Sequence, residues 1–177
     1  NMNQLKQGLV QVYTGNGKGK STAAFGLAIR AVGRGMRVKV VQFMKCDKDY
    51  GEQIMLRKFG DALSLSCYGS GKWVKKGQAS PEDLALAQEA LAEVRHAFQD
   101  GYDVVIMDEL NNALYFELLT LEEVLALLRE KPATVEVVMT GRNAPQELID
   151  AADLVTEMRE IKHPYQKGIN AREGIEF

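Results

Sequence analysis

The sequence predicts an α/β fold in which a mainly parallel sheet is flanked by helices. Short apolar segments alternate with longer segments whose apolar residues recur at helical spacing, and this order requires crossovers between parallel strands. Residues 104–107 are apolar throughout, which is typical of a strand covered on both faces. Because the chain has 177 residues and no repeat or linker, we expect a single domain over residues 1–177.

Strand and helix signals can be placed one after another along the chain. We expect strands at residues 9–13, 38–43, 63–67, 104–107, 135–139 and 154–158. A first helix over residues 20–32 ends at a glycine. Ser80 before Pro81 favours a second helix start, and Thr120 with Glu123 forms a capping box for a third helix, which ends before Pro132. Residues 69–77 predict a long loop, and the residues after 162 lack a regular pattern.

The composition is that of a soluble globular protein. The chain is 46% hydrophobic and 26% charged, with a net charge of −2, so we expect neither nucleic acid nor a membrane as partner. No apolar run approaches the ~20 residues of a membrane span, and no signal peptide is evident. Cys46 and Cys67 match no CxxC pattern, so we expect two free thiols in a cytoplasmic protein.

A glycine-rich segment between the first strand and the first helix predicts a phosphate-binding P-loop. Glycines let successive backbone N–H groups point inward, and the helix N-terminus adds partial positive charge. Lys20 can bind phosphate oxygens of ATP, and the Ser21 hydroxyl can ligate magnesium. The alternative is a glycine-rich turn without a ligand, which the flanking strand and helix disfavour. The expected ATP-binding residues of the loop are Gly15, Asn16, Gly17, Lys18, Gly19, Lys20, Ser21 and Thr22.

This loop is one residue shorter than the common P-loop. Only three residues separate Gly15 from Gly19, and Thr14 stands where the common pattern has its first glycine. A shorter loop should hold a triphosphate differently, so transfer of the γ-phosphoryl group is not the default expectation.

Acidic and basic residues follow two later strands. Asp108 and Glu109 come directly after strand 104–107, as in a Walker B pair, and can hold Mg²⁺ or Mn²⁺ directly or through water. Two solvated acids are the alternative. Arg142 follows strand 135–139 at the same carboxyl edge, where it can contact phosphate or form a surface ion pair.

Together these motifs resemble those of one family, the P-loop ATP:corrinoid adenosyltransferases, also called cob(I)yrinic acid a,c-diamide or cob(I)alamin adenosyltransferases. The short P-loop is itself a trait of that family. The resemblance implies a RecA-like P-loop fold and a homodimer, with a flavoprotein as the reducing partner. It also implies that a Co(I) corrinoid attacks the 5′ carbon of ATP and that inorganic triphosphate leaves. The matching segments are residues 14–26, 40–43 with Lys45, 51–52, 107–110, 140–142, 152–155, 162–163 and 174–177.

The implied chemistry assigns roles to the acidic and basic residues. Because Co(I) is itself a strong nucleophile, the protein has only to position the substrates and stabilise the leaving group. Lys20 and Glu109 are then the expected catalytic residues. The metal would be held by Ser21 and Glu109, with Asp108 supporting it through water.

The corrinoid side departs from the family pattern. Relatives carry Phe-x-Trp after the third strand, and these aromatics are thought to displace the lower axial base of the corrinoid so that its cobalt is easier to reduce. Here Trp73 matches but the phenylalanine does not, and Tyr68 is the substitute we expect at the corrinoid. Alternatively, Trp73 anchors its loop by burying its ring. We expect His163 to be a structural hydrogen-bonding group and His96 to be exposed on a helix.

Other functions compete with adenosyl transfer. A small-molecule kinase or an ATPase would use the same P-loop but would release ADP. A protein that binds nucleotide or corrinoid without catalysis is the remaining alternative. A GTPase is disfavoured because the chain has no Asn-Lys-x-Asp segment.

Overall fold

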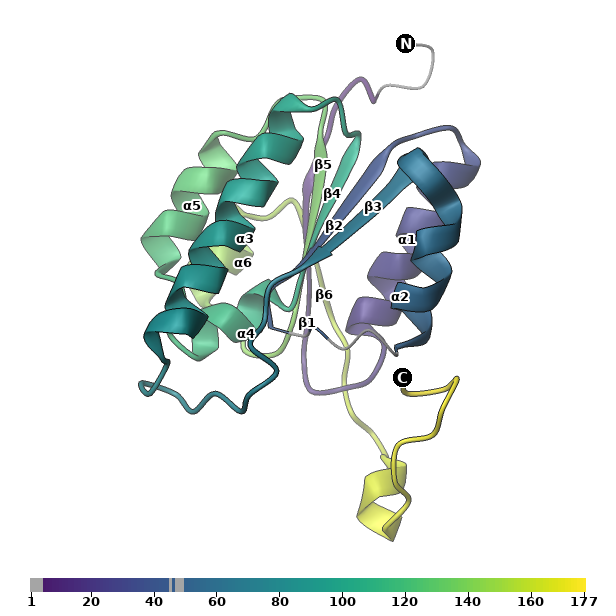
Figure 1. Cartoon of the computed structure of the whole chain (residues 1–177), viewed down its shortest axis with the longest axis vertical. Coiled ribbons are helices and arrows are strands. Elements are labelled where there is room, and N and C mark those ends of the chain that lie inside the picture. The colour runs from purple at the N-terminus through teal and green to yellow at the C-terminus, as the bar shows by residue number, and fades with distance from the viewer. Residues whose placement is uncertain (1–4, 45, 47–49) are drawn as a thin grey trace.

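A six-stranded sheet forms the centre of the computed structural model, which describes residues 5–44, 46 and 50–177 (Figure 1). The strand order is β3-β2-β4-β5-β1-β6, and every pairing is parallel. The predicted α/β fold is therefore confirmed, and each expected strand is present to within one residue at either end. The strands are β1 (Val10–Thr14), β2 (Val38–Gln42), β3 (Leu63–Cys67), β4 (Val104–Asp108), β5 (Glu136–Thr140) and β6 (Leu154–Glu157).

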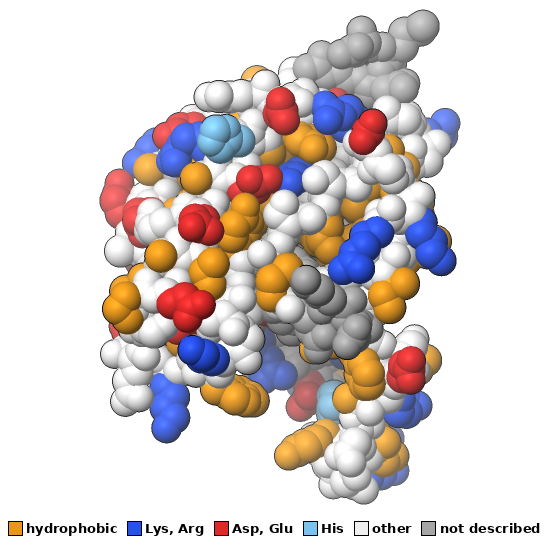
Figure 2. All heavy atoms as spheres, in the orientation of Figure 1, with side chains coloured by type: hydrophobic (Ala, Val, Ile, Leu, Met, Phe, Trp, Pro, Cys, Tyr) orange, Lys and Arg blue, Asp and Glu red, His pale blue; other side chains and the backbone are white. Residues whose placement is uncertain are grey.

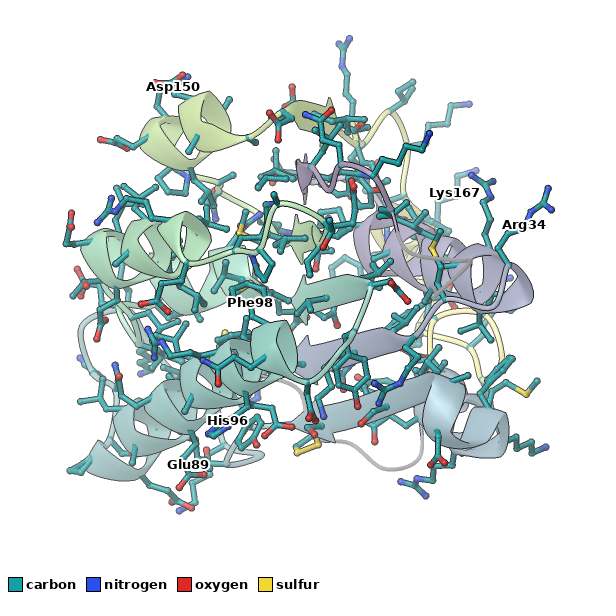
Figure 3. All side chains as sticks on the ribbon, turned by 90° about the horizontal axis from the view of Figure 1, so that it is seen from above. Arg34, Glu89, His96, Phe98, Asp150 and Lys167 are labelled. Atoms are coloured by element: carbon teal, nitrogen blue, oxygen red, sulfur yellow. A yellow bond between two sulfur atoms is a disulfide. The ribbon has the colours of Figure 1, made fainter. Side chains whose placement is uncertain are left out.

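Helices cover both faces of this sheet. In Figure 1, α1 (Lys20–Gly33) and α2 (Gly51–Leu56) lie on one face. The other face carries α3 (Pro81–Gln99), α4 (Leu110–Tyr115), α5 (Leu121–Arg129) and α6 (Gln146–Ala151). The N-cap at Ser80 and the capping box at Thr120 are confirmed, and Ser80 also forms a capping box with Asp83. His96 is exposed as predicted (Figure 3).

Several short helices were not predicted. α2, α4 and α6 each have only six residues, too few to show a helical period in sequence. Two 3₁₀ helices are also present, η1 (Arg57–Ala62) and η2 (Pro164–Lys167). The second shows that the segment after residue 162, expected to be irregular, contains one ordered turn. His163 is the N-cap residue of η2, and its Nδ1 accepts a hydrogen bond from the backbone N–H of Tyr165 at 3.1 Å. This is the structural role expected for this histidine.

The core is divided between the two faces by the alternation of strand side chains. In β4, Val104 and Ile106 belong to the apolar cluster under α1, whereas Val105 and Met107 belong to the cluster under α3. Both sides of the strand are therefore buried, which explains its uninterrupted apolar sequence.

The carboxyl ends of the strands meet at one edge of the sheet. Gln42 at the end of β2 is in register with Asp108 of β4 on one side and with Cys67 of β3 on the other. Tyr13 of β1 is in register with Thr140 at the end of β5. This edge gathers the polar residues that end the apolar strands, and ligands of open parallel sheets bind at such an edge.

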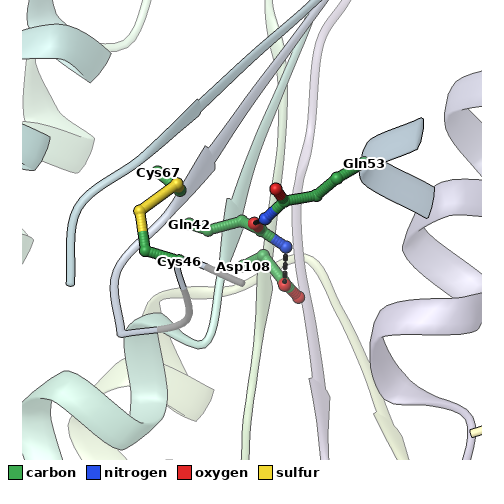
Figure 4. The surroundings of a disulfide bond; sticks show 5 residues. All are labelled: Gln42, Cys46, Gln53, Cys67 and Asp108. Atoms are coloured by element: carbon green, nitrogen blue, oxygen red, sulfur yellow. Dashed lines mark hydrogen bonds between the residues drawn. A yellow bond between two sulfur atoms is a disulfide. The ribbon is translucent and has the colours of Figure 1, made fainter. Parts of the chain in front are cut away.

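The expectation of two free thiols is wrong. Cys46 and Cys67 form a disulfide bond, with Cα atoms 5.3 Å apart (Figure 4). Cys67 ends β3, and Cys46 follows the end of the neighbouring strand β2, so the parallel pairing brings the two together although they are 21 residues apart in sequence. Their sequence spacing gives no sign of this, because the contact depends on which strands are neighbours.

The surface in Figure 2 has acidic and basic side chains interspersed, without a broad patch of one sign on the face shown. Within the described part of the chain, no helix is both long enough and apolar enough to cross a membrane.

Candidate functional site

The P-loop joins β1 to α1 and lies against the end of β6. Gly15 and Gly19 have φ angles of 101° and 119°, in the left-handed region that favours glycine. The Gly17 N–H donates to the carbonyl of Met158, just after β6, at 2.7 Å. A Cβ atom on Gly15 would lie 2.4 Å from that same oxygen. The glycines are thus required both for the backbone turn and for the close approach of β6.

Lys20 and Ser21 form the first turn of α1. The Lys20 ammonium donates to the Gly17 carbonyl at 2.6 Å, so its side chain folds back over the loop. Ser21 Oγ donates to Asp108 Oδ1 at 2.7 Å, which joins the P-loop to the end of β4. The other polar side chains of the loop are exposed: Asn16, Lys18 and Thr22.

The C-terminal tail reaches back to this loop. In Figure 1 the chain leaves the sheet after β6, passes through η2 and returns below α1. There the Lys18 ammonium donates to the carbonyl of Ile175 at 2.9 Å and lies 3.8 Å from a carboxylate oxygen of Glu176. Hydrogen bonds from Arg172 lower the pKa of Glu176 to about 2. The tail therefore places a carboxylate beside a lysine of the P-loop.

Asp108 is the centre of a buried hydrogen-bonding group. Its side chain accepts from Ser21 and from Thr140 Oγ1 through Oδ1, each at 2.7 Å, and from Gln42 Nε2 through Oδ2 at 3.1 Å. Asp108 is 1% exposed, so these hydrogen bonds replace the water it would otherwise bind. A carboxylate and a hydroxyl are oxygen ligands of the kind that Mg²⁺ prefers, so Ser21 and Asp108 fit such an ion.

Glu109 is directed differently from its neighbour. Its backbone has a left-handed φ of 60°, and its N–H donates to Thr140 Oγ1 at 2.9 Å. This conformation, unfavourable for a residue with a side chain, turns the chain between β4 and α4. As a result Asp108 lies beside Ser21 while Glu109 lines a neighbouring cleft. The structure thus brings Asp108 next to the serine expected to bind metal.

This cleft has a volume of ≈ 580 Å³ and extends from Glu109 to the loop after β3. Trp73 stands at its wall with 99% of its surface exposed, so the alternative that this ring anchors its loop by burial is wrong. The expected loop over residues 69–77 is confirmed. The lining residues are Met44, Cys46, Tyr50, Gly71, Lys72, Trp73, Val74, Glu109, Asn112 and Phe116.

Tyr68 lies in a different, smaller pocket that adjoins this cleft. Its hydroxyl donates to Glu93 Oε2 of α3 at 3.3 Å, and the Lys39 ammonium lies 2.7 Å from Glu93 Oε1. Burial and the nearby Glu93 carboxylate raise the pKa of Tyr68, whereas the hydrogen bond from Lys39 lowers the pKa of Glu93. Tyr68 and Trp73 are therefore not brought together as a pair.

Two further predicted residues lie at the margins of the site. The side chain of Arg142 is exposed, and its backbone N–H donates to Asn112 Oδ1 at 3.0 Å, which joins the end of β5 to α4. Lys45, part of the family resemblance, lies outside the described residues.

The geometry also shows residues that the sequence reasoning missed. Gln42, Gln53 and Thr140 are each at most 2% exposed and belong to the hydrogen-bonding group around Asp108. A signal was present for two of them, since Gln42 and Thr140 are polar residues that directly follow apolar pairs at the ends of strands β2 and β5. Gln53 had none, because it lies in a short helix that was not predicted.

Comparison with known proteins identifies the family of this chain. A sequence model described as ATP:corrinoid adenosyltransferase BtuR/CobO/CobP matches residues 6–177. The chain belongs to this adenosyltransferase family. It is 43% identical to a corrinoid adenosyltransferase from Sinorhizobium sp. over 176 residues, covering 97% of this chain and 81% of the relative. The corrinoid adenosyltransferase of Escherichia coli (strain K12) is 38% identical over 175 residues, covering 98% of this chain and 88% of the relative.

A solved structure supports the fold of the adenosyltransferase chain. The flagellar accessory protein FlaH from Methanocaldococcus jannaschii superposes with a TM-score of 0.59 over 86% of this chain and 72% of its own. At 14% sequence identity, this likeness speaks for the fold alone.

Proposed function

We propose that this chain transfers the 5′-deoxyadenosyl group of ATP to the Co(I) centre of a corrinoid, either cob(I)alamin or cob(I)yrinic acid a,c-diamide. The observation that carries the proposal is the placement of two adjacent acids. Asp108 contacts the first turn of the P-loop helix, and Glu109 lines a cleft of ≈ 580 Å³. A nucleotide on the P-loop and a larger substrate in the cleft would therefore meet at this pair.

In the proposed reaction a cobalt–carbon bond forms at the 5′ carbon of ATP while the bond from that carbon to the triphosphate oxygen breaks. The bonding electrons leave with the triphosphate, so negative charge grows on the leaving group. Lys20 and the inward backbone N–H groups of the P-loop would stabilise that charge. For this step the Lys20 ammonium has to exchange the Gly17 carbonyl, which it now contacts, for phosphate oxygens.

Ser21 and Asp108 are the residues we propose to hold Mg²⁺ or Mn²⁺, with Asp108 acting directly or through water. A bound divalent ion would further neutralise the triphosphate. The contact between Ser21 and Asp108 supports this assignment. Glu109, which faces the cleft, would instead act at the boundary between nucleotide and corrinoid.

The remaining ATP contacts are proposed from the loop and its surroundings. Glycines define the turn of the P-loop and would contribute backbone N–H groups: Gly15, Gly17 and Gly19. The polar side chains that would add contacts are exposed to solvent: Asn16, Lys18 and Thr22. Arg142 can reach phosphate only by a movement of its exposed side chain. On the corrinoid side, the exposed ring of Trp73 offers a flat apolar surface within the cleft.

Partners and location extend the same proposal. We take residues 1–177 as one catalytic domain that acts as a cytoplasmic homodimer and receives reduced corrinoid from a flavoprotein. Exposed apolar side chains on the edge strand β6, Leu154 and Val155, support a subunit contact there. Light scattering of the purified chain measures the oligomeric state.

An anaerobic assay tests the function. The chain is mixed with ATP, Mg²⁺ and chemically reduced cob(I)alamin, and both the corrinoid spectrum and the phosphate product are followed. We expect adenosylcobalamin and stoichiometric triphosphate. ADP without a cobalt–carbon bond would instead identify a kinase or an ATPase. Binding of both substrates without any product would identify a binding protein.

A further inference from the structure

A continuous line of buried hydrogen bonds runs from the P-loop to helix α2. Ser21 donates to Asp108. Gln42 Nε2 donates to Asp108 Oδ2 at 3.1 Å, and Gln53 Nε2 donates to Gln42 Oε1 at 2.8 Å; Figure 4 shows these last three residues. Gln42 and Gln53 are 1% and 2% exposed. Two buried glutamines in series, one at the end of β2 and one in α2, are costly to desolvate unless their polar atoms are hydrogen-bonded.

The order of donors and acceptors in this line sets the orientation of one amide. Gln42 can place either its NH₂ group or its carbonyl oxygen against Asp108, and only the NH₂ group is attracted to the carboxylate. Gln53 donates to the carbonyl end of the same amide. Its hydrogen bond therefore favours the orientation in which the NH₂ group of Gln42 faces Asp108.

The orientation of Gln42 bears on metal binding through Asp108. An ionised carboxylate has about four acceptor positions. Ser21, Thr140 and Gln42 occupy three of them, with Ser21 and Thr140 on Oδ1 and Gln42 on Oδ2. The hydrogen bond from Gln42 thus fixes the rotation of the carboxylate and leaves one position of Oδ2 for a fourth partner. Because the Ser21 hydroxyl donates its hydrogen bond to this carboxylate, the lone pairs of the Ser21 oxygen point away from Asp108.

We propose that Gln53 is a positioning residue for the divalent metal of the nucleotide site, acting through Gln42 on Asp108. The inference rests on the proposed function, because it requires Mg²⁺ and ATP at the P-loop. Gln53 lies in α2, which begins directly after Tyr50 in the wall of the large cleft. The metal site is thereby tied to a helix that also borders the proposed corrinoid site.

The test measures how strongly Mg²⁺ enhances ATP binding, with no corrinoid present. Calorimetry gives the Kd of ATP in Mg²⁺ and in EDTA for the wild type and for Gln53→Met, which keeps the length of the side chain and removes its hydrogen bond. We expect the enhancement by Mg²⁺ to fall about fivefold, the size of one hydrogen bond, with the Kd in EDTA within about twofold of wild type. The matched control is Leu56→Met, a buried position in the same helix outside the hydrogen-bonded line.

A double substitution asks whether Gln53 acts through Gln42. We expect Gln42→Met to reduce the enhancement about tenfold, since it removes a hydrogen bond to a charged group. If the two residues act in series, the double variant Gln42→Met with Gln53→Met should also reduce the enhancement by Mg²⁺ about tenfold. Independent contributions would multiply to about fiftyfold and would contradict the proposal.

A pH profile of Gln53→Glu gives a second measurement that does not depend on the methionine variants. Below its pKa the introduced carboxyl is protonated and can donate to Gln42 as the amide does. Above its pKa it is an acceptor and draws the NH₂ group of Gln42 away from Asp108. The enhancement by Mg²⁺ should therefore recover as pH falls, relative to wild type at each pH.

The outcomes separate this inference from the proposed function. If the wild type itself shows no enhancement of ATP binding by Mg²⁺, the proposed metal–nucleotide site is wrong. If the wild type shows it and Gln53→Met keeps it, or weakens binding equally in Mg²⁺ and EDTA, Gln53 is only a structural residue. Melting temperatures of every variant establish that the compared chains are folded.

Discussion

The two halves of the site are built in different ways. The nucleotide half consists of residues at the ends of neighbouring strands, and its central carboxylate, Asp108, is 1% exposed with three hydrogen-bond donors. The proposed corrinoid half is a cleft largely walled by loop residues, and its aromatic residue, Trp73, is 99% exposed. The carboxylate of the nucleotide half is held by hydrogen bonds, whereas the aromatic ring of the cleft is open to solvent.

This difference follows from the chemistry proposed for each half. Stabilising charge on a leaving triphosphate requires donors held in place, because preorganised dipoles do not have to reorient during the reaction. A large planar ligand can instead be held by contact area. Substitutions in the nucleotide half should therefore have large effects on the reaction or on folding, and substitutions in the cleft should have smaller effects that act mainly on the corrinoid.

The largest effect is expected for Lys20→Ala. Removing the ammonium that would bind the triphosphate should lower the transfer rate at least about a hundredfold, as loss of one preorganised donor does. The free energy of unfolding should change by less than about 0.5 kcal/mol, because Lys20 lies at the start of α1 and not in the core. The anaerobic transfer assay and urea unfolding measure the two quantities.

Lys18→Ala is the matched control in the same loop. Lys18 is exposed and contacts the C-terminal tail, so we expect at most about a tenfold loss of rate. Near-normal turnover of Lys20→Ala, or equal losses in both variants, would contradict the assignment of Lys20 to the triphosphate.

A pair of glycines compares the backbones of the two halves. Gly15→Ala introduces a Cβ atom 2.4 Å from the Met158 carbonyl at a φ of 101°, and we expect it to lower the free energy of unfolding by about 3 kcal/mol. In Gly71→Ala the φ is 74° and no atom lies within 4 Å of the new Cβ. We therefore expect the free energy of unfolding to fall by only about 1 kcal/mol. Urea unfolding of both variants measures the contrast, and equal losses would show that the P-loop is no more constrained than the cleft loop.

The degree to which each half could be predicted follows the same division. The P-loop and the strand that ends at Asp108 were predicted because each is encoded in consecutive residues, and all six strands were found from local patterns. The hydrogen bonds of Gln53 and the disulfide of Cys46 with Cys67 were not predicted. The disulfide depends on the pairing of β2 with β3, and the hydrogen bond of Gln53 depends on the packing of α2 against the end of β2. Periodicity along the chain reveals neither contact.

The side-chain directions in the site also lay beyond the sequence. Glu109 follows Asp108 directly, and the sequence pattern predicted that both acids bind the metal. The left-handed backbone at Glu109 comes directly before α4, which contacts the end of β5 where Asn111 Nδ2 donates to the Gly141 carbonyl at 2.9 Å. Sequence motifs therefore predicted a candidate site, while tertiary contacts set the directions of its side chains.

The ion pair of Lys39 with Glu93 lies beside Tyr68, and Glu93→Gln tests its contribution to stability. Lys39 has a side chain 6% exposed and would lose its anionic partner, so we expect the free energy of unfolding at pH 7 to fall by about 2 kcal/mol. The pKa of Glu93 is lowered in the folded chain by the hydrogen bond from Lys39. The stability it contributes is therefore present above its unfolded pKa and is lost as pH falls through its folded pKa. Urea unfolding should show the variant and wild type converging below about pH 4, and a constant difference would contradict the role of the carboxylate charge.

The smallest effect is expected for Trp73→Ala, and it should appear in only one assay. Because the ring is 99% exposed, the free energy of unfolding and the Kd of ATP should stay within about 0.5 kcal/mol of wild type. If the ring helps displace the lower axial base, transfer that starts from Co(II) under weak reduction should slow about tenfold, an amount in the range of one aromatic contact. Transfer from pre-formed Co(I) should slow less than about threefold, since the reduction step is bypassed.

Lys72→Ala is the control for general disturbance of the loop, because Lys72 is also exposed and lines the same cleft. Equal losses from Co(II) and Co(I) would mean that Trp73 contributes only contact area, and the proposed corrinoid half would then need no aromatic residue for reduction.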